Sequence, residues 1–424
     1  MTLLIIVLFL VLLLLGMDVG FAMVLAAVAG IMTRPDAFSD AVMLPLTMLT
    51  SVDSAALLSI PLFILAGELM NSGGVTQRLI HWSLAFVGHL RGALSQVAVV
   101  TNLIMAGISG SAVADATATG TALIPAMKRA GYHEGYAGAV IAAASMLGPI
   151  IPPSIPMVVY AVMANHSVIK IFLGGVIPGF MLAAGYMVIC AWIARRRNYP
   201  AQEKSTWPQR WQATRDSGWA LAMPVIVLAG IRFGIVTDIE AAAVIALYAL
   251  FVGWVIYREL DRGRFVRAIL DAGRSSAVIL FLLAAAGPFG WLLSEAKVNQ
   301  GIRDLLLWIS TDPFVVLVMI NIFLLLIGKI LEPLPAMIIF VPTLLPVAAQ
   351  LHIDPTHFAV IVVLNLMIGL QTPPVGLLLF VSAAVGKEPI GAIIVQIIPF
   401  VLWSLSVLAL IVIFPPLVTW LPSL

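Results

Sequence analysis

The chain has 424 residues, of which 62% are hydrophobic and only 10% are charged, and its mean hydropathy is +1.11. A soluble domain carries about 25% charged residues, so this composition excludes an ordinary soluble protein and predicts an integral membrane protein. The net charge of +2 is too small to suggest nucleic-acid binding, and the one cysteine, Cys190, excludes an intrachain disulfide and a thiolate metal cluster.

The first apolar segment, residues 2–31, is expected to form one transmembrane helix with a polar notch at Asp18. It has no basic start, and its apolar run is longer than that of a cleaved signal peptide. A second apolar piece, residues 57–70, carries Glu68 near its end. At roughly 20 residues per span, we expect about ten to twelve spans plus re-entrant hairpins.

Residues 109–121 combine small and hydroxyl side chains with one carboxylate, Asp115. A carboxylate at membrane depth is costly and by default marks an ion or substrate path. On a helix, Ser111 and Asp115 are four positions apart and share a face. The alternative is that the hydroxyls only pack helices and that Asp115 lies at the membrane interface.

Two segments rich in helix breakers interrupt apolar runs: G-P-I-I-P-P at residues 148–153 and G-L-Q-T-P-P at residues 369–374. Proline blocks the helical backbone and glycine loosens it. In hydrocarbon, broken backbone is tolerated only where protein buries it or where it lines a polar cavity. The freed carbonyl groups and the Thr372 hydroxyl suit a hard cation such as sodium, and half-helix N-termini attract carboxylates. Simple kinks are the alternative.

The two breaks are related by a constant offset, because Gly369 lies 221 positions after Gly148. The same offset relates five more pairs: Gly107 and Gly328, Pro125 and Pro346, Pro152 and Pro373, Pro153 and Pro374, and Pro178 and Pro399. This register predicts that the second half of the chain copies the first. Paired broken segments in two halves are the best sequence pointer to a transporter's substrate and ion site.

Residues 195–274 contain two basic stretches and link the two halves. Three arginines, residues 195–197, open the first stretch, which the positive-inside rule places in the cytoplasm. We therefore predict three parts: a first repeat at residues 1–194, linking helices with basic loops at 195–274, and a second repeat at 275–424.

In the second half, Lys329 and Glu332 stand where the first half has its polar segment. They are three positions apart, so they can serve an ion site or only pair with each other. Four histidines near predicted loops are expected to be solvated: His133, His166, His352 and His357.

An enzyme is the main rival interpretation, because residues 107–110 read G-I-S-G, the nucleophile motif of rhomboid intramembrane proteases. Such a serine needs a general base within hydrogen-bond reach, and no histidine falls in the middle of an apolar run. A channel is a further alternative, but paired broken hairpins favour a carrier.

Several motifs resemble those of the large membrane subunit of tripartite ATP-independent periplasmic (TRAP) transporters, in particular its sugar-acid, diketogulonate-type members. The resemblance covers nearly the whole chain. Its motifs are I-P-L-F at 60–63 followed by A-G-E at 66–68 and Asn71, S-G-S-A-V-A-D at 109–115, I-I-P-P-S at 150–154, and T-P-P-V-G at 372–376.

The resemblance implies an all-α polytopic membrane protein with two inverted repeats, each with a re-entrant helical hairpin, and an elevator-type transport domain that moves against a scaffold. It implies sodium-driven import of an organic anion, either a carboxylate, a dicarboxylate or a sugar acid, across the bacterial inner membrane, without enzymatic activity or a covalent cofactor. The implied partners are a periplasmic substrate-binding protein and a small four-helix membrane subunit. A stand-alone sodium:anion symporter of related fold is the alternative.

Carried over to this sequence, the family's sites predict two sets of residues. The substrate-binding set is Ser109, Gly110, Ser111, Asp115, Pro152, Pro153, Ser154, Thr372, Pro373 and Pro374. Sodium is expected near Ser109, Gly148, Gly328, Glu332, Gly369, Thr372 and Gly376. Three residues depart from the family pattern and leave the geometry of the second ion site open: Glu332 replaces a more usual aspartate, Leu334 replaces a common threonine, and Lys329 is unexpected in its apolar run.

Overall fold

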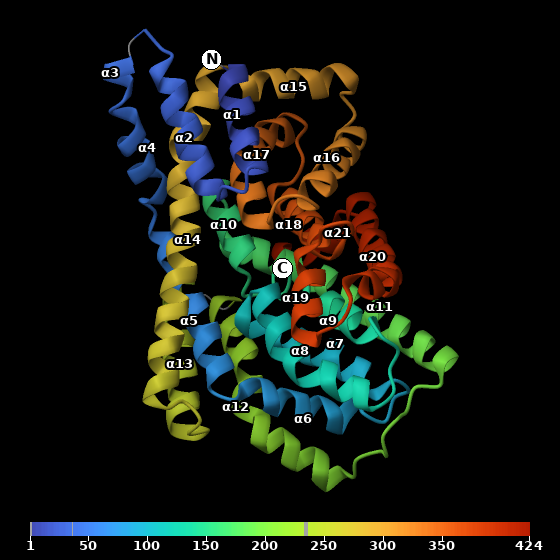
Figure 1. Cartoon of the computed structure of the whole chain (residues 1–424). Coiled ribbons are helices and arrows are strands. Elements are labelled where there is room, and N and C mark those ends of the chain that lie inside the picture. The colour runs from blue at the N-terminus through green and yellow to red at the C-terminus, as the bar shows by residue number, and fades with distance from the viewer. Residues whose placement is uncertain (1, 36, 233–235) are drawn as a thin grey trace.

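The computed structural model describes residues 2–35, 37–232 and 236–424. Within these ranges every regular element is a helix (Figure 1), which confirms the all-α class. Among the described residues, six helices are long and apolar enough to cross a membrane, and eight further apolar helices have 10–17 residues. The number of long helices is smaller than the ten to twelve spans expected, because breaker and capping residues divide several apolar runs into short helices.

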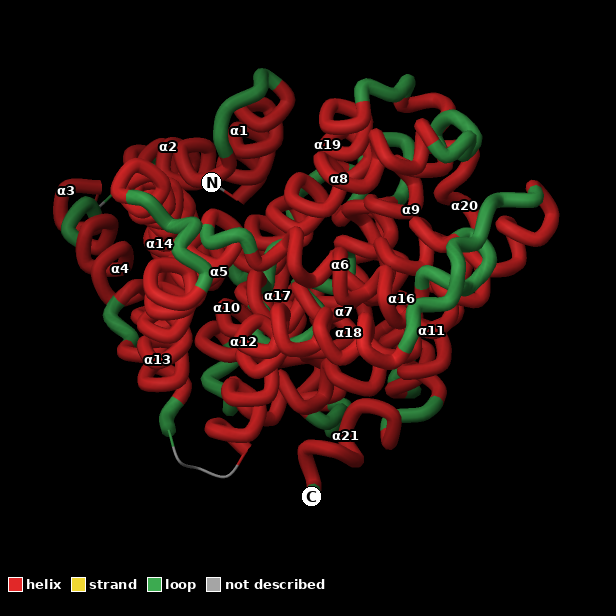
Figure 2. Tube along the Cα trace, turned by 90° about the horizontal axis from the view of Figure 1, so that it is seen from below, coloured by secondary structure: helices red, strands yellow, loops and turns green. Residues whose placement is uncertain are grey.

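One side of the molecule is a bundle around α14 (Arg262–Glu295), a helix of 34 residues. At 1.5 Å per residue it is about 51 Å long and outreaches the roughly 30 Å hydrocarbon core of a bilayer. It packs against α2, α4 and α5, and α5 packs against α13 (Figures 1 and 2). We call this group the α14 bundle: α1 (Thr2–Leu14), α2 (Val19–Met32), α3 (Ala37–Asp40), α4 (Met43–Val52), η1 (Ala55–Leu58), α5 (Ser59–Ser72), α13 (Asp238–Phe251), η2 (Val252–Ile256) and α14.

The rest of the membrane part, which we call the hairpin core, contains both broken segments. Helix α8 packs against α19, α9 against α20, and α10 against α17 and α18, so the two halves of the chain interlock. Its helices are α7 (Ala93–Ser109), α8 (Ala112–Arg129), α9 (Tyr136–Ser145), α10 (Ile155–Met163), α11 (Val168–Arg197), α16 (Pro313–Gly328), α17 (Pro333–Gln350), α18 (Pro355–Gln371), α19 (Leu377–Gly386), α20 (Ile390–Ile413) and α21 (Pro416–Ser423).

Three further helices lie at the ends of the molecule. Helices α6 (Val75–Val87) and α12 (Trp207–Arg232) lie at the lower end in Figure 1, and α15 (Val298–Ile309) crosses the upper end. Helix α6 packs against α7 and α12. Three arginines end α11 and the chain then leads into α12, so the positive-inside rule predicts that the lower end faces the cytoplasm.

The prediction of one helix over residues 2–31 is wrong. Helix α1 ends at Leu14, and α2 begins at Val19 after Gly16, whose φ of +83° lies in the left-handed region. Asp18 is the N-cap of α2, and its side chain accepts a hydrogen bond from the backbone N–H of Gly20 at 2.9 Å. The polar notch is therefore a helix start, which is a common use of aspartate.

Two of the four histidine predictions also need correction. His133 and His352 are exposed as expected, but His357 is buried in α18, and its ring Nε2 lies 2.7 Å from the carbonyl oxygen of Ile411. His166 is half-buried, and its Nε2 lies 2.9 Å from the hydroxyl of Thr356. The His166 ring therefore connects the two halves of the chain, whereas the His357 ring connects α18 to α20 within the second half.

Candidate functional site

The first broken segment is fully buried where α9 gives way to α10. Residues 146–154 follow α9, and the peptide bond between Pro152 and Pro153 is cis. The Ser154 hydroxyl donates to the carbonyl of Pro149 at 2.5 Å and accepts from the N–H of Met157 at 3.3 Å, which caps α10. The break therefore has a defined shape, and its carbonyl groups lie inside the protein.

Helix α7 ends directly against this break. Gly110 has a φ of +61°, and a Cβ at this position would lie 2.6 Å from the carbonyl oxygen of Pro153. Only glycine combines that backbone conformation with so close an approach. Gly110 thus places the chain between α7 and α8 against the first broken segment.

Asp115 is the most unusual polar residue of this region, since its side chain is completely buried. The Ser109 hydroxyl donates to its Oδ1 at 2.5 Å, while its Oδ2 has no hydrogen-bond partner. A Cβ at Gly148 would lie 2.6 Å from that same Oδ2. A buried carboxylate oxygen without a donor is costly, so this oxygen is a candidate ligand for a cation.

The expectation that Ser111 and Asp115 share a helical face needs correction. Ser111 is the N-cap of α8, and its hydroxyl accepts from the N–H of Ala114 at 3.4 Å. The hydroxyl that reaches Asp115 belongs to Ser109, at the end of α7. The chain breaks between the two serines, so helical spacing did not identify the partner.

The second broken segment differs from the first in its exposure. Pro374 and Val375 are exposed, whereas residues 148–154 are buried. The Thr372 hydroxyl donates to the carbonyl of Ile368 at 2.6 Å, and Gly376 has a φ of +53°. A Cβ at Gly369 would overlap the carbonyl group of Gly328, so α18 and α16 touch through their backbones at this point.

A buried polar network that the sequence reasoning missed holds the second break in place. Gln371 donates through Nε2 to the Ser404 hydroxyl at 2.7 Å, and that hydroxyl lies 2.6 Å from the Tyr186 hydroxyl. All three residues are buried. The network ties the residue before Thr372 to α11 and α20. Its sequence signal is a glutamine next to a break inside an apolar run.

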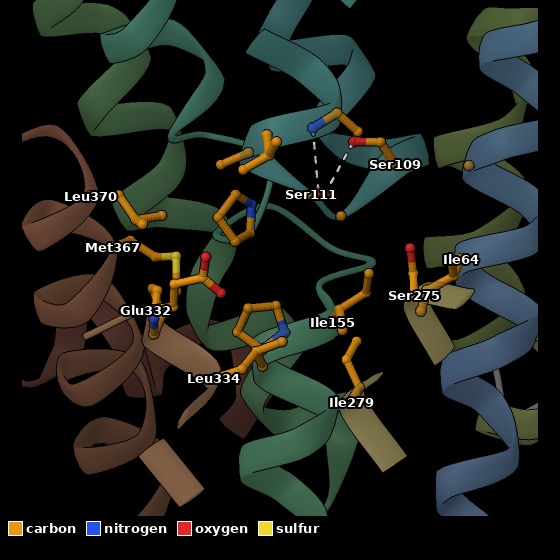
Figure 3. A pocket seen from close by; sticks show the side chains of 18 of the residues that line it. Ile64, Ser109, Ser111, Ile155, Ser275, Ile279, Glu332, Leu334, Met367 and Leu370 are labelled. Atoms are coloured by element: carbon orange, nitrogen blue, oxygen red, sulfur yellow. Dashed lines mark hydrogen bonds between the residues drawn. The ribbon is translucent and has the colours of Figure 1, made fainter. Parts of the chain in front are cut away.

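A cavity of about 230 Å³ lies between the α14 bundle and the hairpin core. Figure 3 shows Glu332 on one side of it, Ser109 and Ser111 above, and Ser275 with Ile64 on another side. Glu68 of α5 also lines it, so two carboxylates face this space. None of the described residues that line it is a lysine, an arginine or a histidine.

The predicted residues are only partly brought together in this cavity. Four of them line it: Ser109, Gly110, Ser111 and Glu332. The others do not line it: Asp115, Gly148, Pro152, Pro153, Ser154, Gly328, Gly369 and Gly376 are buried, and Thr372, Pro373 and Pro374 lie at the second break. Among the ion pairs of the described residues, none joins Lys329 to Glu332.

A second, much smaller cavity of about 20 Å³ adjoins the same region. Its polar lining includes Glu68 and Asn71 from α5 of the bundle, Thr76 from α6, and Ser109 and Asp115 from the core. A cavity needs roughly 10–15 Å³ to hold one water-sized particle. Glu68 was not among the predicted site residues, although a carboxylate at the end of an apolar helix is a signal for one.

The sequence matches the family described as "Tripartite ATP-independent periplasmic transporter, DctM component" over residues 6–417. It is 38% identical to the sialic acid TRAP transporter large permease protein SiaM of Vibrio cholerae serotype O1, covering 96% of this chain and 95% of the relative. It is 37% identical to the 2,3-diketo-L-gulonate TRAP transporter large permease protein YiaN of Escherichia coli K12, covering 95% and 94%.

Some relatives are longer than this chain. The sialic acid TRAP transporter permease protein SiaT of Haemophilus influenzae is 34% identical, and the alignment covers 98% of this chain but 67% of SiaT. Among solved structures, that of the Alcanivorax borkumensis YdaH transporter matches with a TM-score of 0.61 at 15% identity, covering 90% of both chains. At that identity the match shows a shared fold alone. The sequence matches show more: this chain is a membrane permease rather than an enzyme, and it belongs to the DctM component family of TRAP transporters.

Proposed function

We propose that this chain imports an organic anion across the inner membrane by sodium-coupled secondary transport. The observation that carries the proposal is the charge of the larger cavity, which Glu68 and Glu332 line without any basic side chain. An anion brought beside two carboxylates is repelled, and the repulsion is strong where water is excluded. Bound cations would reverse this charge, so cation binding and anion binding would depend on each other.

The donors for such cations are oxygen atoms, which is what a hard cation requires. Around the first break they are the free Oδ2 of Asp115, the Ser109 hydroxyl and the carbonyl groups near Gly148. Around the second break they are Glu332, the Thr372 hydroxyl, and the carbonyl groups near Gly328, Gly369 and Gly376. These residues include all of those expected near sodium, and the pairing of broken hairpins with ion sites is the usual arrangement in secondary transporters.

We further propose that the chain consists of two inverted repeats. Helix α8 covers residues 112–129 and α17 covers 333–350, so both ends differ by 221 positions. Helices α2 and α13, and likewise α6 and α15, match at that offset to within two residues at either end. This supports a repeat longer than the hairpins themselves. The predicted parts 1–194, 195–274 and 275–424 remain a proposal, and the last boundary falls inside α14.

In this arrangement the hairpin core is the transport domain and the α14 bundle is the scaffold. The larger cavity lies between them, with Ser275 and Ile279 contributed by α14 and Glu332 by the core. An elevator-type movement would carry the two broken segments, with the bound cations and substrate, past the α14 bundle. The long α14 suits a fixed wall, because it is longer than the membrane is thick.

The substrate class and the partners follow from the family. Relatives named for sialic acid and for 2,3-diketo-L-gulonate suggest a carboxylate and favour a sugar acid. A tripartite system supplies a periplasmic substrate-binding protein and a small membrane subunit, and SiaT is long enough to contain an additional segment. The proposal assigns both partners to this chain.

The test is uptake into proteoliposomes that contain this chain with its small subunit and binding protein. A panel of labelled sugar acids and dicarboxylates is offered under an inward sodium gradient. We expect accumulation of one class, and at least tenfold slower accumulation for Asp115→Asn. Uptake by the chain without its partners would identify a stand-alone symporter, and equal uptake by Asp115→Asn would overturn the assigned site.

A further inference from the structure

The α14 bundle and the hairpin core meet at the end of α7. Helix α5 belongs to the bundle through its packing on α13 and α14, and it also packs against α7. A Cβ at Gly67 would lie 3.2 Å from the Cα of Ser109, so the backbones of the two helices nearly touch. Ser109 is the residue whose hydroxyl orients Asp115. The buried carboxylate of the core therefore lies close to the bundle.

Glu68, the next residue of α5, lies at the boundary between the two cavities. It lines the 230 Å³ cavity and also the 20 Å³ cavity. Within the part of the chain that the structure describes, no salt bridge engages its carboxylate. A half-buried carboxylate at membrane depth without a cationic partner marks an ion path by default.

The small cavity holds a second and independent indication of a ligand. Asp115 lines it, is completely buried, and has an Oδ2 atom without a hydrogen-bond partner. The amide of Asn71 and the hydroxyl of Thr76 add two neutral oxygens, which hydrogen bond to each other at 3.2 Å. Two carboxylates and neutral oxygens around a space for one water-sized particle fit a monovalent cation.

We propose that Glu68 is a ligand of the coupling cation, shared across the interface with Asp115. This inference rests on the proposed function and adds to it a ligand from the scaffold. Asp115 belongs to the hairpin core, which moves in the proposed mechanism, and Glu68 belongs to the α14 bundle, which stays in place. The cation can therefore have both ligands only while Gly67 lies against Ser109, and it stabilises that conformation.

The arrangement supplies a reason why sodium does not cross alone. A cation held by Glu68 and Asp115 keeps the core against the bundle until another anion takes the place of Glu68. The substrate enters the larger cavity, which Glu68 also lines, so its carboxylate can become the new partner of the cation. The core then moves with cation and anion together, and Glu68 stays behind.

The test is the entry of labelled sodium into proteoliposomes that contain the complete transporter, measured with and without the transported anion. We expect Glu68→Gln to raise sodium entry without anion about tenfold and to raise the sodium concentration for half-maximal anion uptake about tenfold. Glu134→Gln is the matched control, because it makes the same change at an exposed glutamate between α8 and α9 that lines neither cavity. It should behave as the wild type.

The outcomes separate the two proposals. The role of Glu68 would be overturned if Glu68→Gln changed neither the sodium entry without anion nor the sodium concentration for half-maximal anion uptake. Sodium coupling itself would remain intact. Wild-type uptake that ignores sodium would instead overturn the proposed function. If Glu68→Gln does not fold, Glu68→Asp decides: a shorter carboxylate should give intermediate values for both quantities, and wild-type values would contradict the inference.

Discussion

Gly148→Ala is the change that tests the first ion site most sharply. The new Cβ would lie 2.6 Å from Oδ2 of Asp115, 3.2 Å from the carbonyl oxygen of Ser145 and 3.2 Å from the carbonyl carbon of Ser111. The two backbone atoms hold the methyl group in place, so the carboxylate must move. Because Ser109 fixes the other carboxylate oxygen at 2.5 Å, movement also disturbs that hydrogen bond.

The expected size of the effect follows from the cost of overpacking. Extra methylene groups in a packed interior cost about 1–3 kcal/mol, and about 1.4 kcal/mol corresponds to a tenfold change in affinity. If the displaced carboxylate loses that much of its interaction with sodium, the sodium concentration for half-maximal uptake rises about 5- to 150-fold. The affinity of the binding protein for substrate should stay unchanged.

The assay is the sodium dependence of anion uptake in proteoliposomes, with thermal unfolding measured in sodium-free buffer as a check on folding. Gly218→Ala is the control, because a Cβ there meets no heavy atom within 4 Å. A normal sodium dependence in Gly148→Ala, with the protein folded, would refute the assignment of Asp115 Oδ2 as a sodium ligand.

Three further predictions concern the surroundings of the breaks. Ser109→Ala removes the hydroxyl that orients Asp115. Since hydrogen bonds to charged groups contribute about 1.5–3 kcal/mol, the sodium concentration for half-maximal anion uptake should rise at least tenfold. A concentration within twofold of the wild-type value would contradict this. Lys128→Met removes the ion-pair partner of the buried Glu388 carboxylate, 3.5 Å away. Breaking a fully buried pair costs about 3–5 kcal/mol. Because the Lys128 side chain is 38% exposed, we expect the free energy of unfolding to fall by roughly 1–3 kcal/mol. The midpoint of thermal unfolding should therefore be lower than for Arg129→Met, a variant of the exposed neighbouring residue. Gln371→Leu removes the bond to Ser404 that ties the second break to α20, so uptake should fall while binding-protein affinity is unchanged, and wild-type uptake would show that the network is dispensable.

The sequence predicted the features that depend on composition and on backbone chemistry. The apolar runs identified membrane helices, and the paired Gly and Pro segments located both breaks, because two consecutive prolines remove two backbone donors and strongly disfavour the helical backbone. Helix α9 ends at Ser145, before the first break, and α18 ends at Gln371, within the second break and just before its two prolines. These properties are local, so they can be read from neighbouring residues.

The contacts between distant segments could not be predicted in this way. The partner of Asp115 is Ser109 rather than Ser111, because the chain changes direction at Gly110. Glu68 meets the same region only through the packing of α5 on α7, which no spacing within one helix reveals. The split of residues 2–31 at Asp18 was missed because a capping aspartate and a polar notch look alike in an apolar run.

The measurement that tests the central claim most directly is the simultaneous entry of labelled sodium and labelled substrate into proteoliposomes that contain the complete transporter. Coupled transport through the two breaks predicts that both enter in a fixed ratio, and that uptake of the anion stops when choline replaces sodium outside. Anion accumulation at the same rate in choline, without sodium entry, would contradict the account.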